Sequence, residues 1–399
     1  MLAVGTGNSM LAALLPPLIR QLHLPDSSIG WIFSLSALLW VVTSPYWGRL
    51  SNHTGRKPVI AGGLLAFAAS MGAFALVVSA GQNGWLVGPA LFVSLIAARS
   101  IYGAFGSAAS PAAQAYVADR THVLERTEQL AQLSAAFAVG QAFGPGLCAA
   151  LAARTGLVFP LLVVSLFAAG AAFAIWRFLD EPQRPKVAPI QRESPWASLH
   201  FARDPRIAGY LIFGFGMSVV TGTLQQVFAL YTMDTLHVRD RAGAEMAALG
   251  FMVYALTLLA TQMAVLPRLR LAPRSLMIWG TGVIAAGVTM QMLAPSLGTL
   301  LVSQVVQGLG FGLARPGFTG GASMSVRADE QGASAGLVVA VNGAGFVFSP
   351  LTGAVAYERF GMETPLWITL ALLAAMWAFA FRSRRLRRTV LEPGAPSEV

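Results

Sequence analysis

The chain has 399 residues, of which 55% are hydrophobic and only 11% are charged, and its formal net charge is +10. A soluble protein of this size would have about 25% charged residues, so the composition indicates an integral membrane protein. The positive residues lie in short loops between apolar runs, which argues against a nucleic-acid-binding surface. The single cysteine, Cys148, lies in an apolar run, which excludes an internal disulfide framework or a thiolate metal site.

Twelve apolar runs follow one another along the chain. Each is close to the length of about 20 residues that crosses a bilayer as a helix, and a helix satisfies its own backbone in lipid. We therefore predict an all-α membrane protein with helices at residues 2–20, 29–47, 58–80, 88–118, 128–153, 156–178, 208–233, 244–266, 275–293, 297–322, 331–356 and 363–382. The first run lacks the basic segment of a signal peptide, so no cleavable signal is expected, and nothing in it fixes Met1 as the natural start.

The loops predict the orientation, because Lys and Arg collect on the cytoplasmic side. With both termini in the cytoplasm, the inner loops and the tail hold 20 of the 27 Lys and Arg residues, and the outer loops hold 5. Arg99 and Arg315 remain inside predicted spans. The distribution predicts a multi-pass protein of the inner membrane with both ends in the cytoplasm.

The chain also contains an internal repeat. A stretch rich in Pro and charge, 179–207, reads as a cytoplasmic linker between two six-helix bundles at 1–178 and 208–382, and a basic tail follows at 383–399. The halves align without a gap at an offset of 205 residues, which pairs Gly103 with Gly308, Pro111 with Pro316, Glu125 with Glu330, Gly140 with Gly345 and Pro145 with Pro350. Paired bundles are a transporter design, with the substrate site near the midplane where the repeats meet.

Four motifs resemble those of the major facilitator superfamily. They are "GRLSNHTGRK" between spans two and three, "RSIYGAFG" in span four, "AYVADRT" at its end, and "GQAFGP" in span five. Within that superfamily the chain is most similar to drug–proton antiporters of the tetracycline-exporter type. The resemblance implies the major facilitator fold, a secondary transporter in which two pseudo-symmetric bundles rock about a central cavity, and protons as the coupling ion.

Two features depart from the family pattern. The resemblance implies an aspartate and an arginine where this chain has Asn52 and His53, so the gating ion pair of that aspartate is lost or replaced by a neutral hydrogen bond. The predicted spans also hold no Asp or Glu in their middle portions, whereas relatives that exchange substrate for protons usually keep a membrane carboxylate. The sequence therefore leaves the proton carrier unnamed.

The loop motif predicts a gate. We assign this role to Gly48, Asn52, Gly55, Arg56, Lys57 and Asp119. The glycines allow a tight turn between close helices, and the basic pair can bond neighbouring acids such as Asp119 or Glu125. The whole segment 48–60 is interpreted as a cytoplasmic loop. We interpret its charges as a latch that favours one face of the cycle; the alternative is charge that only sets topology.

Two arginines are the main candidates for the substrate site. Arg99 lies about 17 Å into span four at 1.5 Å per residue, and an arginine at that depth almost always faces a cavity or a partner. It could bind a substrate anion or take part in proton coupling, or it could bond helix carbonyls. Arg315 lies nearer the cytoplasmic end, among residues that break helices, and could bind substrate or extend to the interface.

Further polar groups and a glycine-rich turn complete the candidate set. Gln225, Gln226, Gln307 and Asn342 lie inside apolar spans and could bind substrate or only join helices, and Asn8 is a weaker candidate of the same kind. Gly140, Gly144 and Pro145 are interpreted as a close-packed, bent contact between helices. No metal ligands, Walker loop or nucleophile–base pair are found, so no cofactor and no enzymatic activity are expected.

The prediction is therefore a monomeric secondary transporter that moves a small organic molecule by alternating access. Proton-coupled export is the first choice, because "GQAFGP" in span five resembles the superfamily motif that is associated with antiporters. Uptake or exchange of an organic anion is the alternative, because two membrane cations face no membrane acid. A membrane sensor or a lipid-modifying enzyme on the same scaffold would need a further domain or a catalytic cluster, and the sequence shows neither.

Overall fold

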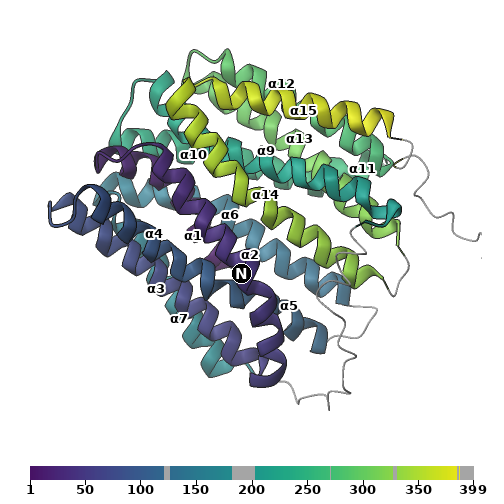
Figure 1. The fold of residues 1–399 in the computed structure, drawn as a ribbon, viewed down its shortest axis with the longest axis horizontal. Coiled ribbons are helices and arrows are strands. Elements are labelled where there is room, and N and C mark those ends of the chain that lie inside the picture. Colours follow the sequence, from purple (N-terminus) through teal and green to yellow (C-terminus); the bar gives the residue numbers. More distant parts are fainter. Residues whose placement is uncertain (121–125, 182–202, 270, 327–329, 384–385, 387–399) are drawn as a thin grey trace, which may run out of the picture.

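The computed structural model describes residues 1–120, 126–181, 203–269, 271–326, 330–383 and 386. Within these residues, twelve helical segments are long and apolar enough to cross a membrane, which confirms the predicted number. They form two bundles of six, drawn in Figure 1 as purple-to-blue helices for the first half and teal-to-yellow helices for the second. Most of the predicted linker, 182–202, and most of the predicted tail lie outside the described residues.

The first bundle contains α1 (Leu2–Gln21), α2 (Ser27–Thr54), α3 (Arg56–Gln82), α4 (Gly88–Ala104), α5 (Ala109–Arg120), α6 (Arg126–Thr155) and α7 (Phe159–Phe178). One of its crossings is broken, because the short 3₁₀ turn Gly106–Ala108 joins α4 to α5. The sequence predicted a single uninterrupted helix there. The break lies one turn beyond Tyr102, close to the deepest arginine of the bundle.

The second bundle contains α9 (Pro205–Thr235), α10 (Asp240–Ala260), α11 (Leu266–Leu269), α12 (Pro273–Met292), α13 (Leu297–Met324), α14 (Gln331–Phe360) and α15 (Thr364–Arg382). A π-helical turn, Thr261–Val265, joins α10 to α11. Such turns are rare in helices and often lie at functional positions. The second bundle begins at Pro205, three residues before the predicted edge, because Asp204 caps the helix by accepting a hydrogen bond from the Arg206 backbone.

The helices run between two ends of the molecule. We call the end that carries the α2–α3 turn, the last residues of α7 and the start of α9 the linker end. The opposite end carries the α1–α2 loop at 22–26 and the α9–α10 loop at 236–239.

Repeat-related glycines make equivalent contacts in the two bundles. A Cβ on Gly140 of α6 would overlap the backbone of α1, since it would lie on the Leu2 carbonyl and 2.8 Å from the Thr6 nitrogen. A Cβ on Gly345 of α14 would lie 2.9 Å from the Val219 nitrogen of α9. In both bundles a glycine thus lets the fifth crossing approach the first crossing at backbone distance.

The same holds for the pair Gly103 and Gly308. Gly103 of α4 meets the backbone of α2 at Ser36, and Gly308 of α13 lies where a Cβ would be 2.7 Å from the Tyr254 carbonyl of α10. In each bundle the fourth crossing therefore packs on the second through a glycine. The offset of 205 residues read from the sequence is repeated in the packing of the helices.

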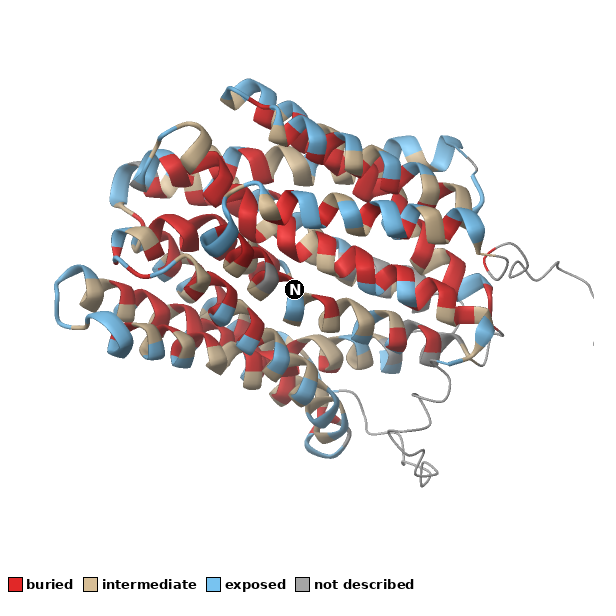
Figure 2. Ribbon diagram, turned by 45° about the horizontal axis from the view of Figure 1, so that its top comes forward, coloured by how far each residue is buried: buried red, intermediate tan, exposed pale blue. Residues whose placement is uncertain are grey.

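The bundles touch each other along α2 and α14, along α10 with α1 and α6, and between α1 and α9. Gly30 and Gly343 allow the first of these contacts: a Cβ on Gly30 would lie 2.7 Å from the Pro350 carbonyl, and one on Gly343 would lie 2.9 Å from Val41. Figure 2 shows buried residues on the helix faces turned toward neighbouring helices and exposed residues on the outward faces. Many of the outward residues are large and apolar, as expected for faces in contact with lipid.

The predicted loop at 48–60 is wrong in extent. Helix α2 continues to Thr54, α3 begins at Arg56, and Gly55 alone separates them. Gly55 has a φ of +105°, which lies outside the range that L side chains readily adopt, so the reversal depends on this glycine. The low hydropathy of residues 48–54 was interpreted as a loop, but it marks a helix that extends beyond the apolar layer.

Candidate functional site

Arg99 is a buried cation at the centre of the first bundle. It lies in α4, and only 3% of its surface is exposed. Its Nη2 atom donates a hydrogen bond of 2.6 Å to Oδ1 of Asn8 on α1. The guanidinium lies 4.5 Å from the ring centre of Tyr102 and 5.5 Å from that of Phe33 on α2. These distances are within the range of cation–π attraction.

Two of its nitrogens remain without a partner. Among the described residues, Nε and Nη1 of Arg99 are buried and make no hydrogen bond. An unsatisfied buried donor costs free energy, and more so when it is charged. Within the described residues no acid forms an ion pair with Arg99. The site can therefore accept an anionic group or an oxygen-rich ligand that supplies the missing acceptors.

Neighbouring side chains hold this cation in position. Asn8 donates from Nδ2 to the Tyr102 hydroxyl at 3.1 Å, so the asparagine joins α1 to both groups of α4. Tyr102 follows Arg99 by three residues and thus lies on the same helix face. Its ring packs edge-on against Phe67 of α3, with centroids 5.0 Å apart. Asn8, the weakest of the predicted polar candidates, is therefore the direct partner of the strongest one.

The other predicted polar residues lie in different surroundings. Arg315 is exposed on α13 and forms no ion pair with any described residue. Gln226 of α9 is buried, and its Oε1 has no described partner. Gln225 and Asn342 are partly exposed. The described contacts do not bring Arg315 or any of these groups onto Arg99.

Gln307 is engaged within its own bundle. It is 2% exposed and donates from Nε2 to Oε1 of Gln291 on α12 at 2.9 Å. A Cβ on Gly287 of α12 would lie 2.7 Å from the Gln307 side chain, so the glutamine fills the α12–α13 contact. This is the helix-joining role that was the alternative to substrate binding. We therefore leave Gln307 out of the candidate site.

The α2–α3 turn is an ion-paired unit of the first bundle. Arg56 donates from Nε to Oδ2 of Asp119 on α5 at 2.9 Å, and from Nη1 to the Ser51 hydroxyl at 2.6 Å. Glu181, just after α7, accepts hydrogen bonds from the backbone nitrogens of Arg56 and Lys57 at 2.6 and 2.9 Å. A carboxylate at that position satisfies free donors at the start of α3 and complements the helix dipole.

The remaining gate residues add detail to this unit. The Lys57 ammonium lies 5.8 Å from the ring centre of Trp176 on α7. Gly48 faces Pro111, with a Cβ distance of 3.7 Å. The side chain of Asn52, like residue Glu125, lies outside the described part of the chain. All described bonds of the turn thus stay inside the first bundle. Glu181 was missed from the sequence, although an acid three residues after an apolar span was the available signal.

At the opposite end a different cluster joins the two bundles. Arg20 at the end of α1 binds Asp26 of its own bundle at 2.8 Å and Asp234 of α9 in the other bundle, with a second bond to Asp234 at 2.9 Å. The Tyr357 hydroxyl of α14 donates to the same Asp234 at 2.6 Å. We call Arg20, Asp26, Asp234 and Tyr357 the clasp.

The clasp was also missed from the sequence. Arg20 was counted only as an outer-loop charge, and the acids were set aside because they lie at helix ends. A second bond beside it crosses in the same place, since the Ser27 backbone nitrogen donates to Glu358 at 2.6 Å. The structure is therefore closed at the opposite end by polar bonds between the bundles. At the linker end the described ion pairs, Arg56–Asp119 and Arg206–Glu330, each stay within one bundle.

Comparison with known families decides the class of the protein. The family model for the Major Facilitator Superfamily matches residues 1–269 and 242–398, which together cover nearly the whole chain. The chain belongs to the major facilitator superfamily. It is thus a secondary transporter, and the predicted fold of two six-helix bundles is confirmed.

Curated relatives of this superfamily member are resistance proteins. It is 26% identical over 369 residues to multidrug resistance protein 2 of Bacillus subtilis, covering 88% of this chain and 85% of that protein. It is also 26% identical over 366 residues to the class D tetracycline resistance protein of Salmonella ordonez, covering 90% and 87%. The predicted similarity to tetracycline exporters is confirmed by these matches.

Solved structures agree on the fold. A bacterial homologue of the human lysosomal transporter Spinster, in an inward-facing and unoccupied conformation, superposes with a TM-score of 0.75 at 14% identity and covers 98% of each chain. The human organic anion transporter MFSD10 superposes with a TM-score of 0.66 at 20% identity, covering 95% of this chain and 96% of that one. Within the described residues of this transporter, no group of three or more His, Cys, Asp or Glu side chains could hold a metal ion.

Proposed function

We propose that this transporter exports a small organic compound from the cytoplasm, coupled to the proton gradient, and that it works as a monomer in the inner membrane. The observation that carries the proposal is the buried guanidinium of Arg99, which keeps two donors unpaired at mid-depth in the first bundle. The resistance proteins among its relatives support the direction of transport.

The loop charges and the clasp together support the direction. The linker end holds most of the Lys and Arg residues, so it faces the cytoplasm by the positive-inside rule, with both termini there. The clasp closes the other end. The described ion pairs cross between the bundles at the far end and stay within one bundle at the cytoplasmic end. This pattern fits a carrier in the state that accepts a cytoplasmic substrate.

Asp234 supports the coupling to protons. It is a carboxylate bonded both to the other bundle, through Arg20, and to Tyr357 of its own bundle. Protonation removes its charge, which weakens the bond to Arg20 and favours separation of the bundles at the opposite end. A proton taken from the far side would thus open the carrier toward that side.

The α2–α3 turn acts as the latch of the cytoplasmic face in this proposal. Arg56, held by Asp119 and Ser51, ties the turn to α5, which continues the helix that carries Arg99. Rearrangement of this ion pair when the bundles rock would link the substrate site to the gate. Lys57 and Gly55 serve the same unit, one through its backbone bond to Glu181 and the other through its backbone conformation.

Substrate would contact Arg99 and Asn8 in the first bundle. From the second bundle, Arg315, Gln225, Gln226 and Asn342 would complete the site. Gln226 is the best supported of these four, because its buried carbonyl oxygen has no described partner. Two unpaired donors on one side and one unpaired acceptor on the other suit a ligand that is both polar and anionic or zwitterionic.

The second candidate function is uptake or exchange of an organic anion. The lack of an acid beside Arg99 in the described structure favours it, because a cation left unpaired in lipid is best satisfied by a charged ligand. In this case the carrier needs no proton, and binding of the anion itself would allow the bundles to rock.

The test uses everted membrane vesicles and three labelled sets of compounds: organic anions, cations and neutral drugs. We expect accumulation inside the vesicles that depends on the proton gradient. Arg99→Gln should lower it about ten-fold or more, the size expected for losing charge-assisted hydrogen bonds. The matched control is Arg359→Gln, at the opposite end of α14 and in no described ion pair.

Exchange of anions that ignores the proton gradient would replace the first proposal by the second. If Arg99→Gln transports as well as the wild type, Arg99 is not part of the substrate site in either candidate function. The absence of flux for every compound class would contradict a role as an exporter of such compounds.

A further inference from the structure

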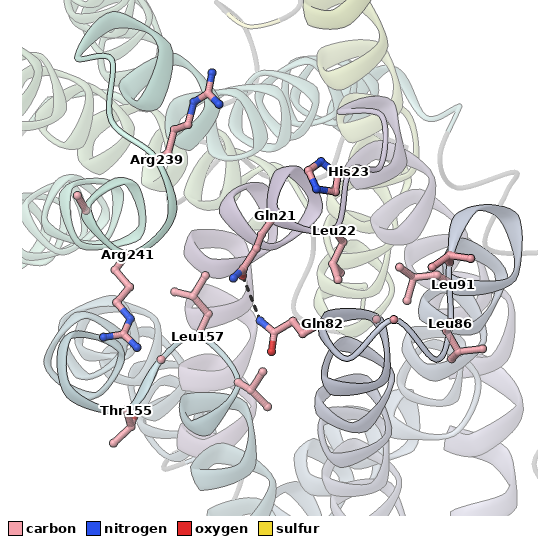
Figure 3. Close-up of a pocket in the computed structure, with 16 residues that line it drawn as sticks. Gln21, Leu22, His23, Gln82, Leu86, Leu91, Thr155, Leu157, Arg239 and Arg241 are labelled. Carbon is pink, nitrogen blue, oxygen red and sulfur yellow. Dashed lines mark hydrogen bonds between the residues drawn. The ribbon is translucent and has the colours of Figure 1, made fainter.

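A pocket lies at the opposite end of the molecule, and Arg99 is not among its lining residues. Its volume is about 1000 Å³, and residues from both bundles line it. The first bundle contributes the end of α1, the α3–α4 loop and the α6–α7 loop. The second contributes the start of α10 with the residue before it. Figure 3 shows this arrangement: Arg239 and Arg241 lie on one side but point in opposite directions, with Arg241 turned toward Thr155 and Leu157, and the bonded pair Gln21 and Gln82 lies across the space.

The lining of this pocket is cationic. Arg239 and Arg241 are among its residues, and no Asp or Glu is among the described side chains that line it. The side chain of Asp240 lies outside the described part of the chain. Asp234 of the clasp is already bonded to Arg20 and Tyr357. Glu245, one turn after Arg241 on α10, is in no described ion pair. No described residue forms an ion pair with either pocket arginine.

Arg241 reaches across to the first bundle. A Cβ on Gly156 of the α6–α7 loop would lie 3.5 Å from its Nη2 atom. Gly156 has a φ of +88°, so a side chain there would be strained, and the turn stays bare beside the guanidinium. Thr155, next to it, adds a hydroxyl group to the lining. On the facing wall Gln82 donates to Gln21 at 3.1 Å, which holds both amides at the rim.

The rest of the lining is apolar. Leu22, Leu91 and Leu157 are buried, and Leu86 and Val158 are half-buried around the same space. The volume lies at the upper end of pockets that hold drug-sized molecules. A guanidinium group beside leucines, as Arg241 lies beside Leu157, matches a ligand that has one anionic group and an apolar body.

We propose that this pocket is a second ligand site, which binds an amphipathic organic anion through a carboxylate or phosphate on Arg241, with Arg239 adding positive charge at the same wall. The apolar part of the ligand lies against the leucines. Such an anion can be a free solute or the headgroup region of an anionic phospholipid, since the chemistry of recognition is the same.

The site exists only while the opposite end is closed, because its two walls belong to different bundles. A bound anion therefore joins the bundles beside the clasp and stabilises the closed state. This consequence rests on the alternating access of the proposed function, whereas the binding itself does not.

The experiment measures binding to the full-length protein in phosphatidylcholine nanodiscs. The probe is octanoate below its micellar concentration, followed by the midpoint of thermal unfolding at constant ionic strength. We expect a saturable rise for octanoate and none for octanol or octylamine of the same chain length. Arg241→Gln should raise the half-saturating concentration about ten-fold, and Arg359→Gln should leave it unchanged.

Arg241 is exposed, so its replacement should not change the stability of the fold. The unfolding midpoint of Arg241→Gln without ligand should therefore equal that of the wild type, and a lower midpoint would reveal a folding defect. Octanoate binding that is equal in wild type and in the Arg239→Gln, Arg241→Gln double variant would overturn the proposal. Equal binding of octylamine would also overturn it.

Two further arms identify the source of the anion and the joining of the bundles. The ligand is a lipid if phosphatidylglycerol nanodiscs raise the unfolding midpoint of the wild type but not of Arg241→Gln, and if octanoate then has no further effect. The ligand is a solute if octanoate still binds in these nanodiscs. Arg20→Ala removes the clasp without changing a lining residue, and it should weaken octanoate binding several-fold. Unchanged affinity in Arg20→Ala would overturn the claim that the ligand joins the bundles. No arm needs transport, so failure here is distinct from failure of the export proposal.

Discussion

The two ends of the transporter differ in where their charged side chains find partners. At the linker end, Arg56 binds Asp119 within the first bundle, and Arg206 binds Asp204 and Glu330 within the second. At the opposite end, Arg20 binds an acid of each bundle, and the Ser27 backbone binds Glu358 across the same boundary. The number of charges is greater at the linker end, yet among the described residues the ion pair that crosses between the bundles lies at the other end.

The conformational state therefore depends on whether a charged side chain is bonded to its own bundle or to the other one, and not on how many charges lie at each end. Ion pairs within a bundle can form without contact between the bundles, whereas a pair between bundles stabilises only the state in which they touch. The charges that set topology and the charges that hold the carrier closed are thus different sets, although both are arginines near helix ends.

The largest effect on this comparison is expected from Gly30→Val. A Cβ there would lie 2.7 Å from the Pro350 carbonyl and 2.9 Å from the Leu351 Cα atom, so α2 and α14 must separate at the opposite end. Overpacking of this kind costs about 1–3 kcal/mol, which shifts the balance toward the open state about 5- to 150-fold. Spin labels at Gln82→Cys and Ala242→Cys in a Cys148→Ser background would report the longer distance.

The control for this change lies on the same helix. Gly48→Val is at the linker end, where the nearest atom to its Cβ is the Pro111 side chain at 3.7 Å. It should leave the distance between the labels unchanged. An equal response of the two glycine variants would contradict the assignment of closure to the opposite end.

A smaller shift is expected from Arg20→Ala. It removes the charged bonds between the bundles but leaves the helix contacts, and the pair is partly open to solvent, so we expect about a ten-fold shift toward the open state. The same pair of labels measures it. Arg154→Ala, at the same end and in no described ion pair, should give the wild-type distance. A wild-type distance in Arg20→Ala would show that apolar packing alone closes this end.

Arg56→Ala should affect stability without changing the opposite end. Its bonds to Asp119 and Ser51 lie within the first bundle, at a partly exposed position, so the expected loss is about 1 kcal/mol or less. Thermal unfolding in nanodiscs would show a small decrease, while the label distance stays at its wild-type value. A longer distance between the labels in Arg56→Ala would mean that the α2–α3 turn helps to hold the opposite end closed.

The smallest effect is a dependence on pH at the start of α9. Bonds from the Arg206 side chain lower the pKa of Asp204 below its ordinary value near 4. A lowered pKa in the folded state means that the stabilisation is present above the unfolded pKa and is lost as the pH falls through the folded one. The unfolding midpoint should therefore decrease slightly more below pH 4 in the wild type than in Asp204→Asn. If the unfolding midpoints of the wild type and of Asp204→Asn change with pH in the same way, Asp204 does not contribute to the acid dependence of stability.

Much of the architecture could be predicted from local properties of the chain. Twelve helices follow from apolar runs of bilayer length, and the bundle repeat follows from glycines and prolines at one offset. Residues 48–54 could not be placed correctly from hydropathy, because a helix that extends into water is as polar as a loop. The reversal at Gly55 was within reach, since a glycine there was already recognised as a turn.

The candidate site was predictable only in part. Arg99 was found because a cation deep in an apolar span is costly and must have a reason. Its partner Asn8 was ranked low, since nothing in the sequence reports which helices meet. Gln307 had the same sequence signal as Gln226, and only the packing of α12 on α13 gave it a partner in Gln291.

By itself, then, the sequence determined how many times the chain crosses the membrane, how its halves correspond and which motifs relate it to transporters. Each of these depends on hydropathy, charge or spacing along the chain. The tertiary structure decided which arginines are paired, which end is closed and which walls form the pocket of Arg239 and Arg241. Those properties arise between residues as far apart as Arg20 and Asp234, and a bond between them exists only once both bundles have folded and met.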